Sequence, residues 1–238
     1  MPTSLADIAG RVMKRVIDRL HRAGPDAAEV WRRCSDEQVM AAMLRLGDYE
    51  DEGQVIIRAE LLRRGLVSSI PDHPDIQVYV IRRAGVLMEV VSVLPMEVVF
   101  RHGTVIESVV GRLLMPSLGG GTLTPENFDA NPLFADFLHD VIARHAADEP
   151  DLIEEARRLG SGKVYVIDGR TPTPAGAVPA ADILGSFGVD GGAVVAGSYE
   201  RNPNHTVLSA TGFFRLSRTL HDRLAAELTS RTVDWARS

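Results

Sequence analysis

The chain has 238 residues, a single cysteine and a formal net charge of −6 at pH 7. The lone thiol, Cys34, excludes an internal disulfide, and the lack of a Cys-x-x-Cys pair argues against a thiolate zinc site. Residues 1–68 carry as many acidic as basic side chains, so the excess of acid lies in residues 69–238. An acidic body of this kind is a poor general binder of nucleic acid, and we expect no nucleic-acid partner.

The segment near the start of the chain predicts a cytoplasmic protein. Arg11, Lys14 and Arg15 interrupt its apolar positions, so it lacks the continuous apolar stretch of a signal peptide. No stretch of the sequence reaches the roughly 18 apolar residues of a membrane span. Only Lys14 and Lys163 among the 26 basic residues are lysines, a bias typical of GC-rich bacterial genomes. We therefore expect a soluble bacterial protein of the reducing cytoplasm.

Residues 5–20 predict an amphipathic helix with a basic face. Apolar side chains recur at i, i+3 and i+4 from Leu5 to Leu20, and Gly24 follows as a terminator. The opposite face carries the cations Arg11, Lys14, Arg15, Arg19 and Arg22. Such a face would suit an acidic partner, a nucleic acid or an anionic membrane. Asp7 and Asp18 interrupt the positive charge, which favours a helix that packs its apolar side on the core.

Three further helices are predicted before residue 68. Pro25 suits the first position of a helix that continues to Trp31. Ser35 and Gln38 match a capping box, so a second helix is expected from there to Gly47. Acidic side chains at the start and arginines at the end complement the dipole of a helix from Tyr49 to Arg64. Residues 1–68 are therefore expected to form a helical subdomain.

The prolines and polar residues of 68–75 predict a boundary, after which an α+β domain is expected over 75–238. Alternating β-branched residues predict strands at 76–82 and 86–94. The stretch from Val98 to Leu114 is ambiguous. Residues 96–100 (MEVVF), which overlap its start, would extend a strand. Residues 103–114 (GTVIESVVGRLL) suit a helix interrupted by a glycine.

The remaining elements follow from proline and glycine signals. Thr124-Pro125 and Asn131-Pro132 each resemble an N-cap followed by proline, and the second helix should reach about residue 146. Further expected elements are a helix at 150–159, a strand at 163–167, a hairpin of 183–189 and 193–198 around Asp190-Gly191-Gly192, and a helix at 218–228. The predicted fold class is α+β. A helical N-terminal subdomain precedes a small, mostly antiparallel sheet covered by the helices near 105–160 and 218–228.

One constellation suggests metal chemistry. The order of His102, His139-Asp140 and Asp168 resembles the ligand order of the HD-domain metal-dependent phosphohydrolases. The resemblance covers about 70 residues and implies a hydrolase in which two histidines and two aspartates hold cations that activate water. The sequence departs from the family where Asp168 ends an apolar strand rather than a helix. It departs again at 141–144, where the family carries a small-basic pair.

A second constellation suggests ligand binding. Residues 182–214 are dense in glycine, asparagine, aromatic and β-branched residues. Their polar tips are Tyr199, Arg201, Asn202, Asn204 and His205. These side chains would serve a small-molecule-binding module, because loops carry function disproportionately. A compact hairpin sheet with tight turns requires the same composition.

The other short patterns exclude familiar enzymes. Gly160-Ser161-Gly162-Lys163 is not a phosphate loop, because Arg157 stands where its first glycine must fall. The sequence contains no Gly-x-Ser-x-Gly elbow and no Ser-x-x-Lys pair. It therefore predicts a non-enzymatic protein with a protein partner and no cofactor: an adaptor, assembly factor or regulator. The metal-dependent hydrolase and the small-molecule-binding module are the alternatives.

Overall fold

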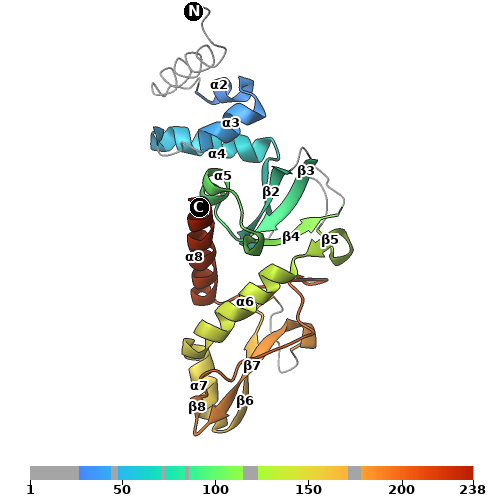
Figure 1. Cartoon of the computed structure of the whole chain (residues 1–238), viewed down its shortest axis with the longest axis vertical. Coiled ribbons are helices and arrows are strands. Elements are labelled where there is room, and N and C mark those ends of the chain that lie inside the picture. Colours follow the sequence, from blue (N-terminus) through green and yellow to red (C-terminus); the bar gives the residue numbers. More distant parts are fainter. Residues whose placement is uncertain are drawn as a thin grey trace, which may run out of the picture.

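The computed structural model describes residues 27–43, 48–70, 73–83, 86–114, 123–170 and 178–237. In these ranges the chain forms helices and antiparallel sheets, so the predicted α+β class is confirmed. The elements follow one long axis, with the N-terminal helices at one end, a five-stranded sheet in the middle and a second sheet at the other (Figure 1). The helix expected at 5–20 and most of the loop expected at 116–124 lie outside the described residues.

Within the described residues, three helices precede the first sheet: α2 (Ala27–Arg33), α3 (Asp36–Met43) and α4 (Asp51–Arg63). The capping box before α3 is confirmed, because Ser35 N–H donates to Gln38 Oε1 at 2.7 Å and Gln38 N–H donates to Ser35 Oγ at 3.3 Å. Arg64 joins the three helices. Its guanidinium donates to Glu60 of α4 at 2.7 Å, Asp36 of α3 at 2.8 Å and the carbonyl of Trp31 in α2 at 2.8 Å.

The five-stranded sheet follows chain order, and each strand is antiparallel to its neighbour. Its strands are β1 (Val67–Ile70), β2 (His73–Arg83), β3 (Val86–Ser92), β4 (Val109–Leu113) and β5 (Phe128–Ala130). Strand β1 crosses the boundary expected at residue 68, so this sheet includes residues from both sides of it. The division into two domains stays a prediction.

Between β3 and β4 the structure reverses the alternatives that the sequence offered. The MEVVF residues form the helix α5 (Met96–His102), and the later residues form a turn of 3₁₀-helix, η2 (Ile106–Ser108), followed by strand β4. Gly111 lies in that strand, and glycine is required there because a Cβ would come 2.3 Å from Cζ of Phe128. Glycine thus marks a close approach of two strands rather than a break in a helix.

The second half begins with α6 (Pro132–His145) and α7 (Pro150–Leu159). Asn131 caps α6 by accepting from Leu133 N–H at 3.1 Å, as its Asn-Pro start predicts. Pro125 opens only the 3₁₀ turn η3 (Pro125–Asn127), so the helix expected there is wrong. Strand β5 follows at once, because Phe128 and the two residues after it pair with β4.

The second sheet has four strands, all paired antiparallel. They are β6 (Gly162–Ile167), β7 (Ile183–Asp190), β8 (Ala193–Val194) and β9 (Glu200–Arg201). The predicted hairpin turn is confirmed: Asp190 pairs with Ala193 around Gly191 and Gly192, whose φ angles are +54° and +78°. Its second strand, expected to reach residue 198, ends at Val194. Two consecutive positive φ angles are the geometry of a tight hairpin turn that favours glycine.

The chain closes with a short hairpin, β10 (Leu208–Ser209) and β11 (Gly212–Phe213), and with the helix α8. This helix runs from Arg218 to Trp235, beyond its expected end at 228. Ser217 caps it by accepting from Leu220 N–H at 3.2 Å. None of the helices in the described ranges is long and apolar enough to cross a bilayer.

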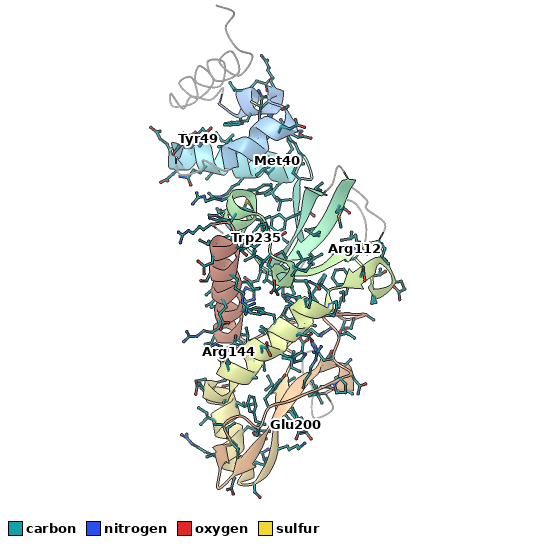
Figure 2. All side chains as sticks on the ribbon, viewed as in Figure 1. Met40, Tyr49, Arg112, Arg144, Glu200 and Trp235 are labelled. Carbon is teal, nitrogen blue, oxygen red and sulfur yellow. The ribbon has the colours of Figure 1, made fainter. Side chains whose placement is uncertain are left out.

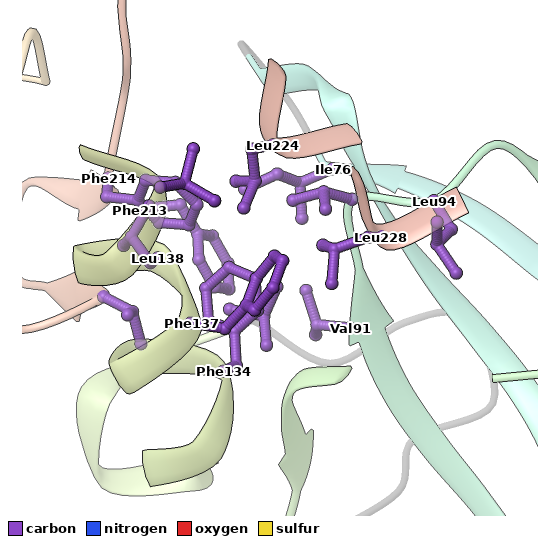
Figure 3. Close-up of a cluster of buried hydrophobic side chains, with 14 of the residues drawn as sticks. Ile76, Val91, Leu94, Phe134, Phe137, Leu138, Phe213, Phe214, Leu224 and Leu228 are labelled. Carbon is purple, nitrogen blue, oxygen red and sulfur yellow. The ribbon is translucent and has the colours of Figure 1, made fainter. Parts of the chain in front are cut away.

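The central core joins elements that are far apart in the sequence. Figure 3 shows side chains of β2 and β3 meeting those of α6 and α8, with Phe213 and Phe214 beside them. Its labelled members are Ile76, Val91, Leu94, Phe134, Phe137, Leu138, Phe213, Phe214, Leu224 and Leu228, all buried. On the outer side of this contact, Arg144 and His145 of α6 both bind the carboxylate of Glu227 in α8. Helix α8 therefore holds the sheet and α6 together.

Candidate functional site

Several charged and polar side chains converge near the second sheet. Asp168 follows β6, Arg170 lies two residues later, Asp182 ends the turn before β7, and His205 lies in the loop after β9. Their side chains are at most 3% exposed. We call Asp168, Arg170, Asp182 and His205 the buried cluster.

Asp168 is the acceptor at the centre of the buried cluster. Its Oδ1 accepts from the backbone N–H groups of Arg170 at 3.0 Å and Arg215 at 2.7 Å. Its Oδ2 accepts from Nε and Nη2 of Arg170 and from Nε2 of His205. Burial opposes ionisation, but the hydrogen bonds from His205 and Arg170 outweigh it and hold the pKa of Asp168 below its usual value. A carboxylate so fully bonded has no lone pair left for a metal or a substrate proton.

The hydrogen bonds of Arg170 show whether Nε2 of His205 carries a hydrogen. Nη2 of Arg170 lies within hydrogen-bond distance of Asp168, of the Thr206 carbonyl at 2.6 Å and of His205 Nε2 at 2.9 Å. Nη2 carries only two hydrogens, and the two oxygens are the better acceptors. The Nε2 atom of His205 therefore carries its own hydrogen and donates it to Asp168.

A buried imidazole–phenol pair adjoins the buried cluster. His139 of α6 stacks on Tyr199 at an interplanar angle of 29°, with Nδ1 at 2.8 Å from the Tyr199 hydroxyl. The ring of His205 also contacts His139, edge-on, with 5.7 Å between the ring centroids. Gly185 allows this packing, because a Cβ there would lie 2.6 Å from the Tyr199 hydroxyl oxygen.

His139 is held neutral. Burial, with the nearby charges of Arg201 and His205, lowers its pKa to about 3, and burial raises the pKa of Tyr199. In the part of the chain that the structure describes, Nε2 of His139 is the one buried side-chain nitrogen or oxygen without a hydrogen-bond partner. The Tyr199 hydroxyl also reaches the Leu184 carbonyl at 3.2 Å. Because the hydroxyl donates there, His139 carries its hydrogen on Nδ1, and its Nε2 without a partner is an acceptor.

Only part of the proposed metal set comes together. His139 and Asp168 lie on two sides of His205, but Asp140 is exposed on α6 and half-buried His102 ends α5. Neither of these two residues hydrogen-bonds to the buried cluster within the described ranges. Across those ranges, no group of three or more His, Cys, Asp or Glu side chains is arranged to hold a metal ion.

The five residues expected to bind a ligand have separate tasks. Tyr199 and His205 point into the buried interior. Asn202 donates to the carbonyls of Ala180 and Ile183, both at 2.6 Å, and so fixes a turn. The other two are exposed: Arg201 pairs with Asp136 of α6, and Asn204 lies in the turn.

Arg170 and Asp182 were not among the site residues expected from the sequence. Both lie in or beside loops without helical or strand periodicity, so no local pattern signals their burial. The only sequence signal for a site here is the tripeptide Asp168-Gly169-Arg170 directly after a predicted strand. The pairing of β6 with β7, residues far apart in the chain, is what brings Asp168 and Asp182 together.

A groove of about 1810 Å³ lies on the other half of the molecule. Residues of α3, α5, η2 and the end of α8 line it, together with β2 to β5. Figure 2 labels Met40, Arg112 and Trp235, which come from three of these elements. We call this feature the α3–α8 groove.

The α3–α8 groove exposes apolar side chains. Trp235 is 60% exposed and Ile106 is 48% exposed. Met40, Met88 and Phe100 are half-buried along it. Exposed aromatic, methionine and aliphatic side chains gathered in one concavity are typical of binding surfaces.

Its charges are partly unpaired. Three lining arginines bind acidic neighbours: Arg64 with Asp36, Arg112 with Asp129 and Arg231 with Glu107. Two further lining acids, Glu37 and Asp234, are exposed and have no ion pair within the described residues. The rim therefore presents a small net negative charge.

Comparison of the chain with protein-family models, with curated protein sequences and with solved structures finds no match.

Proposed function

We propose that this chain is a protein-interaction protein that binds a helical segment of a partner in the α3–α8 groove. The observation that carries the proposal is the exposure of Trp235 and Ile106 inside a concave surface. Tryptophan is the residue most enriched among those that dominate binding energy at protein interfaces. The indole of Trp235 is 60% exposed at the end of α8, so a partner could bury much of its apolar surface.

The size of the groove favours a peptide over a small molecule. Pockets for small ligands enclose about 300–1,000 Å³, whereas the α3–α8 groove has about 1810 Å³. A helix about 10 Å across that filled this volume would be about 23 Å long, roughly 15 residues. Helix-in-groove binding is one of the common modes of peptide recognition.

The buried cluster gives no support to the hydrolase alternative. Its carboxylate is occupied by hydrogen bonds from Arg170, Arg215 and His205, which leaves no room for a water-activating cation. We infer that these side chains hold loops in place, while the groove serves the partner. The groove combines a volume of about 1810 Å³ with exposed apolar anchors.

A peptide panel tests the proposal. Fluorescently labelled amphipathic helices of about 15 residues, with basic, acidic or neutral polar faces, are titrated with the protein and followed by anisotropy. Replacing both anchors, as Trp235→Ala with Ile106→Ser, should weaken binding about tenfold or more, because hot-spot residues each contribute more than about 1.4 kcal/mol.

The chain offers a matched control. Tyr165 and Ile167 of β6 are 53% and 45% exposed on the second sheet, remote from the groove lining. The pair Tyr165→Ala with Ile167→Ser removes a similar apolar surface and should leave binding unchanged. Equal loss in the two double variants, or no binding by any peptide, would refute a specific groove.

A further inference from the structure

We propose that strand β6 pairs antiparallel with β6 of a second copy of this chain and so joins the second sheets of two molecules into one. The strand forms an edge of the second sheet, at the end of the molecule opposite the N-terminal helices (Figure 1). Three features of β6 support this pairing: its length, its free backbone groups and its exposed side chains. The surface is separate from the α3–α8 groove, so the pairing goes beyond the proposed function.

Strand β6 is the longest edge strand among the described residues. It has six residues and pairs on one side only, with β7. The edge strands β1 and β5 have four and three residues, and β8, β9, β10 and β11 have two each. Proteins keep edge strands short to prevent sheets from joining, whereas a longer edge is a template for another strand. Strand β6 therefore lacks a protection that the other edges have.

Hydrogen bonds of the neighbouring strand show which backbone groups of β6 point to the free edge. Gly188 of β7 donates its N–H to Ser198 Oγ at 2.8 Å, and its carbonyl accepts from Val195 N–H at 2.9 Å. Both groups point away from β6, so those of Lys163, the direct partner of Gly188, point away from β7. The register of this part of β6 is regular, so Tyr165 repeats the orientation. The backbone groups of these two residues have no partner strand in the described structure.

The side chains beside these backbone groups are compatible with a second strand. The two valines of β6 are buried on the inner face, whereas Tyr165 and Ile167 are 53% and 45% exposed on the outer face. Lys163, the charged residue of the strand, binds Glu200 of β9 in its own chain. Its ammonium is therefore neutralised within each molecule and does not repel a second copy. Aromatic and β-branched residues also pair well across antiparallel strands.

The strand is complementary to itself. With a twofold axis at Val164, Lys163 of one copy faces Tyr165 of the other as a hydrogen-bonded pair, and the reciprocal pair forms by symmetry. All the free N–H and C=O groups of the two residues are then paired, and the buried faces of the two sheets lie on the same side. An axis at Tyr165 would instead need Ile167, where the register between β6 and β7 shifts. A second copy with its axis at Val164 is thus the occupant that β6 fits.

Sedimentation velocity over a range of protein concentrations tests the pairing. A single pair of short strands forms a small interface, so a reversible dimer should appear between about 10 μM and about 1 mM. Tyr165→Lys sets an ammonium opposite Lys163 of the other copy at two symmetric positions and should weaken dimerisation about tenfold or more. A wild-type chain that stays monomeric throughout would overturn the proposal.

Val195→Lys is the matched control. Val195 is 41% exposed and follows β8, so the substitution adds the same charge at an exposed apolar position on the other side of β7. This variant should dimerise like the wild type. Equal loss of the dimer in Val195→Lys and Tyr165→Lys would show that net charge, rather than the edge of β6, controls self-association, and would overturn the pairing.

Tyr165→Glu tests the register. It sets a carboxylate opposite Lys163 of the second copy, so the dimer should dissociate within about threefold of the wild-type concentration. With the axis at Tyr165, like charges would face each other in both the lysine and the glutamate variant. Loss of the dimer in both would therefore overturn the register with its axis at Val164.

Amide hydrogen exchange of the wild type gives a reading that needs no variant. The N–H groups of Lys163 and Tyr165 should exchange slowly in the dimer and quickly after dilution, whereas those of Val164 and Val166, which face β7, should be slow in both. A dimer in which Lys163 and Tyr165 still exchange quickly would overturn the pairing. Slow exchange of these two amides in the dilute monomer would also overturn it, because their edge would then be covered within one chain.

Discussion

The buried cluster and the α3–α8 groove use polar side chains in opposite ways. In the cluster, Asp168 and Arg170 are removed from water, and each hydrogen-bonding atom of that carboxylate is engaged. Along the groove, Glu37 and Asp234 remain in water without an ion pair in the described structure, beside an exposed indole. The interior must satisfy its charges because an unpaired buried charge is costly, whereas the surface can leave apolar and charged groups for a partner.

The largest effect should come from removing the central carboxylate. Asp168→Ala leaves the guanidinium of Arg170 buried without its main partner and frees two backbone N–H groups. Breaking a buried ion pair on one side costs about 3–5 kcal/mol. We expect a loss of that size in the free energy of unfolding measured with urea.

Asp129→Ala is the control for this substitution. Asp129 also pairs with an arginine, Arg112, but the two side chains are 47% and 53% exposed. Its removal should cost less than about 1 kcal/mol, since solvent screens an exposed pair. Similar losses in the two variants would break the distinction between a structural cluster and a solvated surface.

A second effect should appear in acid. The pKa of His139 is lowered to about 3 in the folded protein, whereas an unfolded histidine titrates near 6.5. Between these values the unfolded chain binds the extra proton, so stability is complete above about pH 6.5 and falls by up to about 1.4 kcal/mol per pH unit as the pH drops towards 3. His139→Phe should reduce that slope, as measured by urea unfolding between about pH 6.5 and 4.

Tyr199→Phe serves as the comparison for His139→Phe. It removes the hydroxyl that contacts Nδ1 but keeps the imidazole buried, so most of the acid slope should remain. The carboxylates of Asp168 and Glu60, whose pKa values are also lowered, contribute equally to both variants. An unchanged slope in His139→Phe would show that this imidazole is not kept neutral by the fold.

The smallest effect on stability is expected in the groove. Trp235→Ala removes a side chain that is 60% exposed at the end of α8. Surface substitutions usually change the free energy of unfolding by no more than about 0.5 kcal/mol. A thermal unfolding midpoint near that of the wild type, together with weakened peptide binding, would sharpen the contrast with Asp168. A large loss of stability would show that Trp235 belongs to the core.

Local signals in the sequence predicted the elements whose ends are fixed by neighbouring residues. The Ser35–Gln38 capping box, the Asn131-Pro132 start of α6 and the Gly191-Gly192 turn are all confirmed. In each case the bonds or backbone angles that define the end lie within a few residues of one another. Such ends depend little on the rest of the fold.

Residues 96–113 could not be assigned because tertiary contacts override local preference there. Val99 is β-branched yet lies in α5, where its burial in the core compensates for a weak helical preference. Phe100 of the same helix packs edge-on against Tyr79 of β2. The decisive neighbours are far away in the chain, so no short window of sequence contains them.

The candidate sites were even less accessible from sequence. His139, Asp168 and His205 were each singled out, but in two different hypotheses, and only the fold shows that they lie together. The α3–α8 groove is assembled from seven or more elements, and each contributes one or a few ordinary apolar residues. Neither arrangement has a motif of its own.

The position of α8 in the chain has a consequence for synthesis on the ribosome. This helix covers Phe134, Phe137 and Leu138 of α6 and holds them against the sheet, yet it is translated after every element that it contacts. Until residues 218–235 have emerged, those aromatic and aliphatic side chains have no cover from α8. The central core should therefore close only after residues 218–235 have emerged.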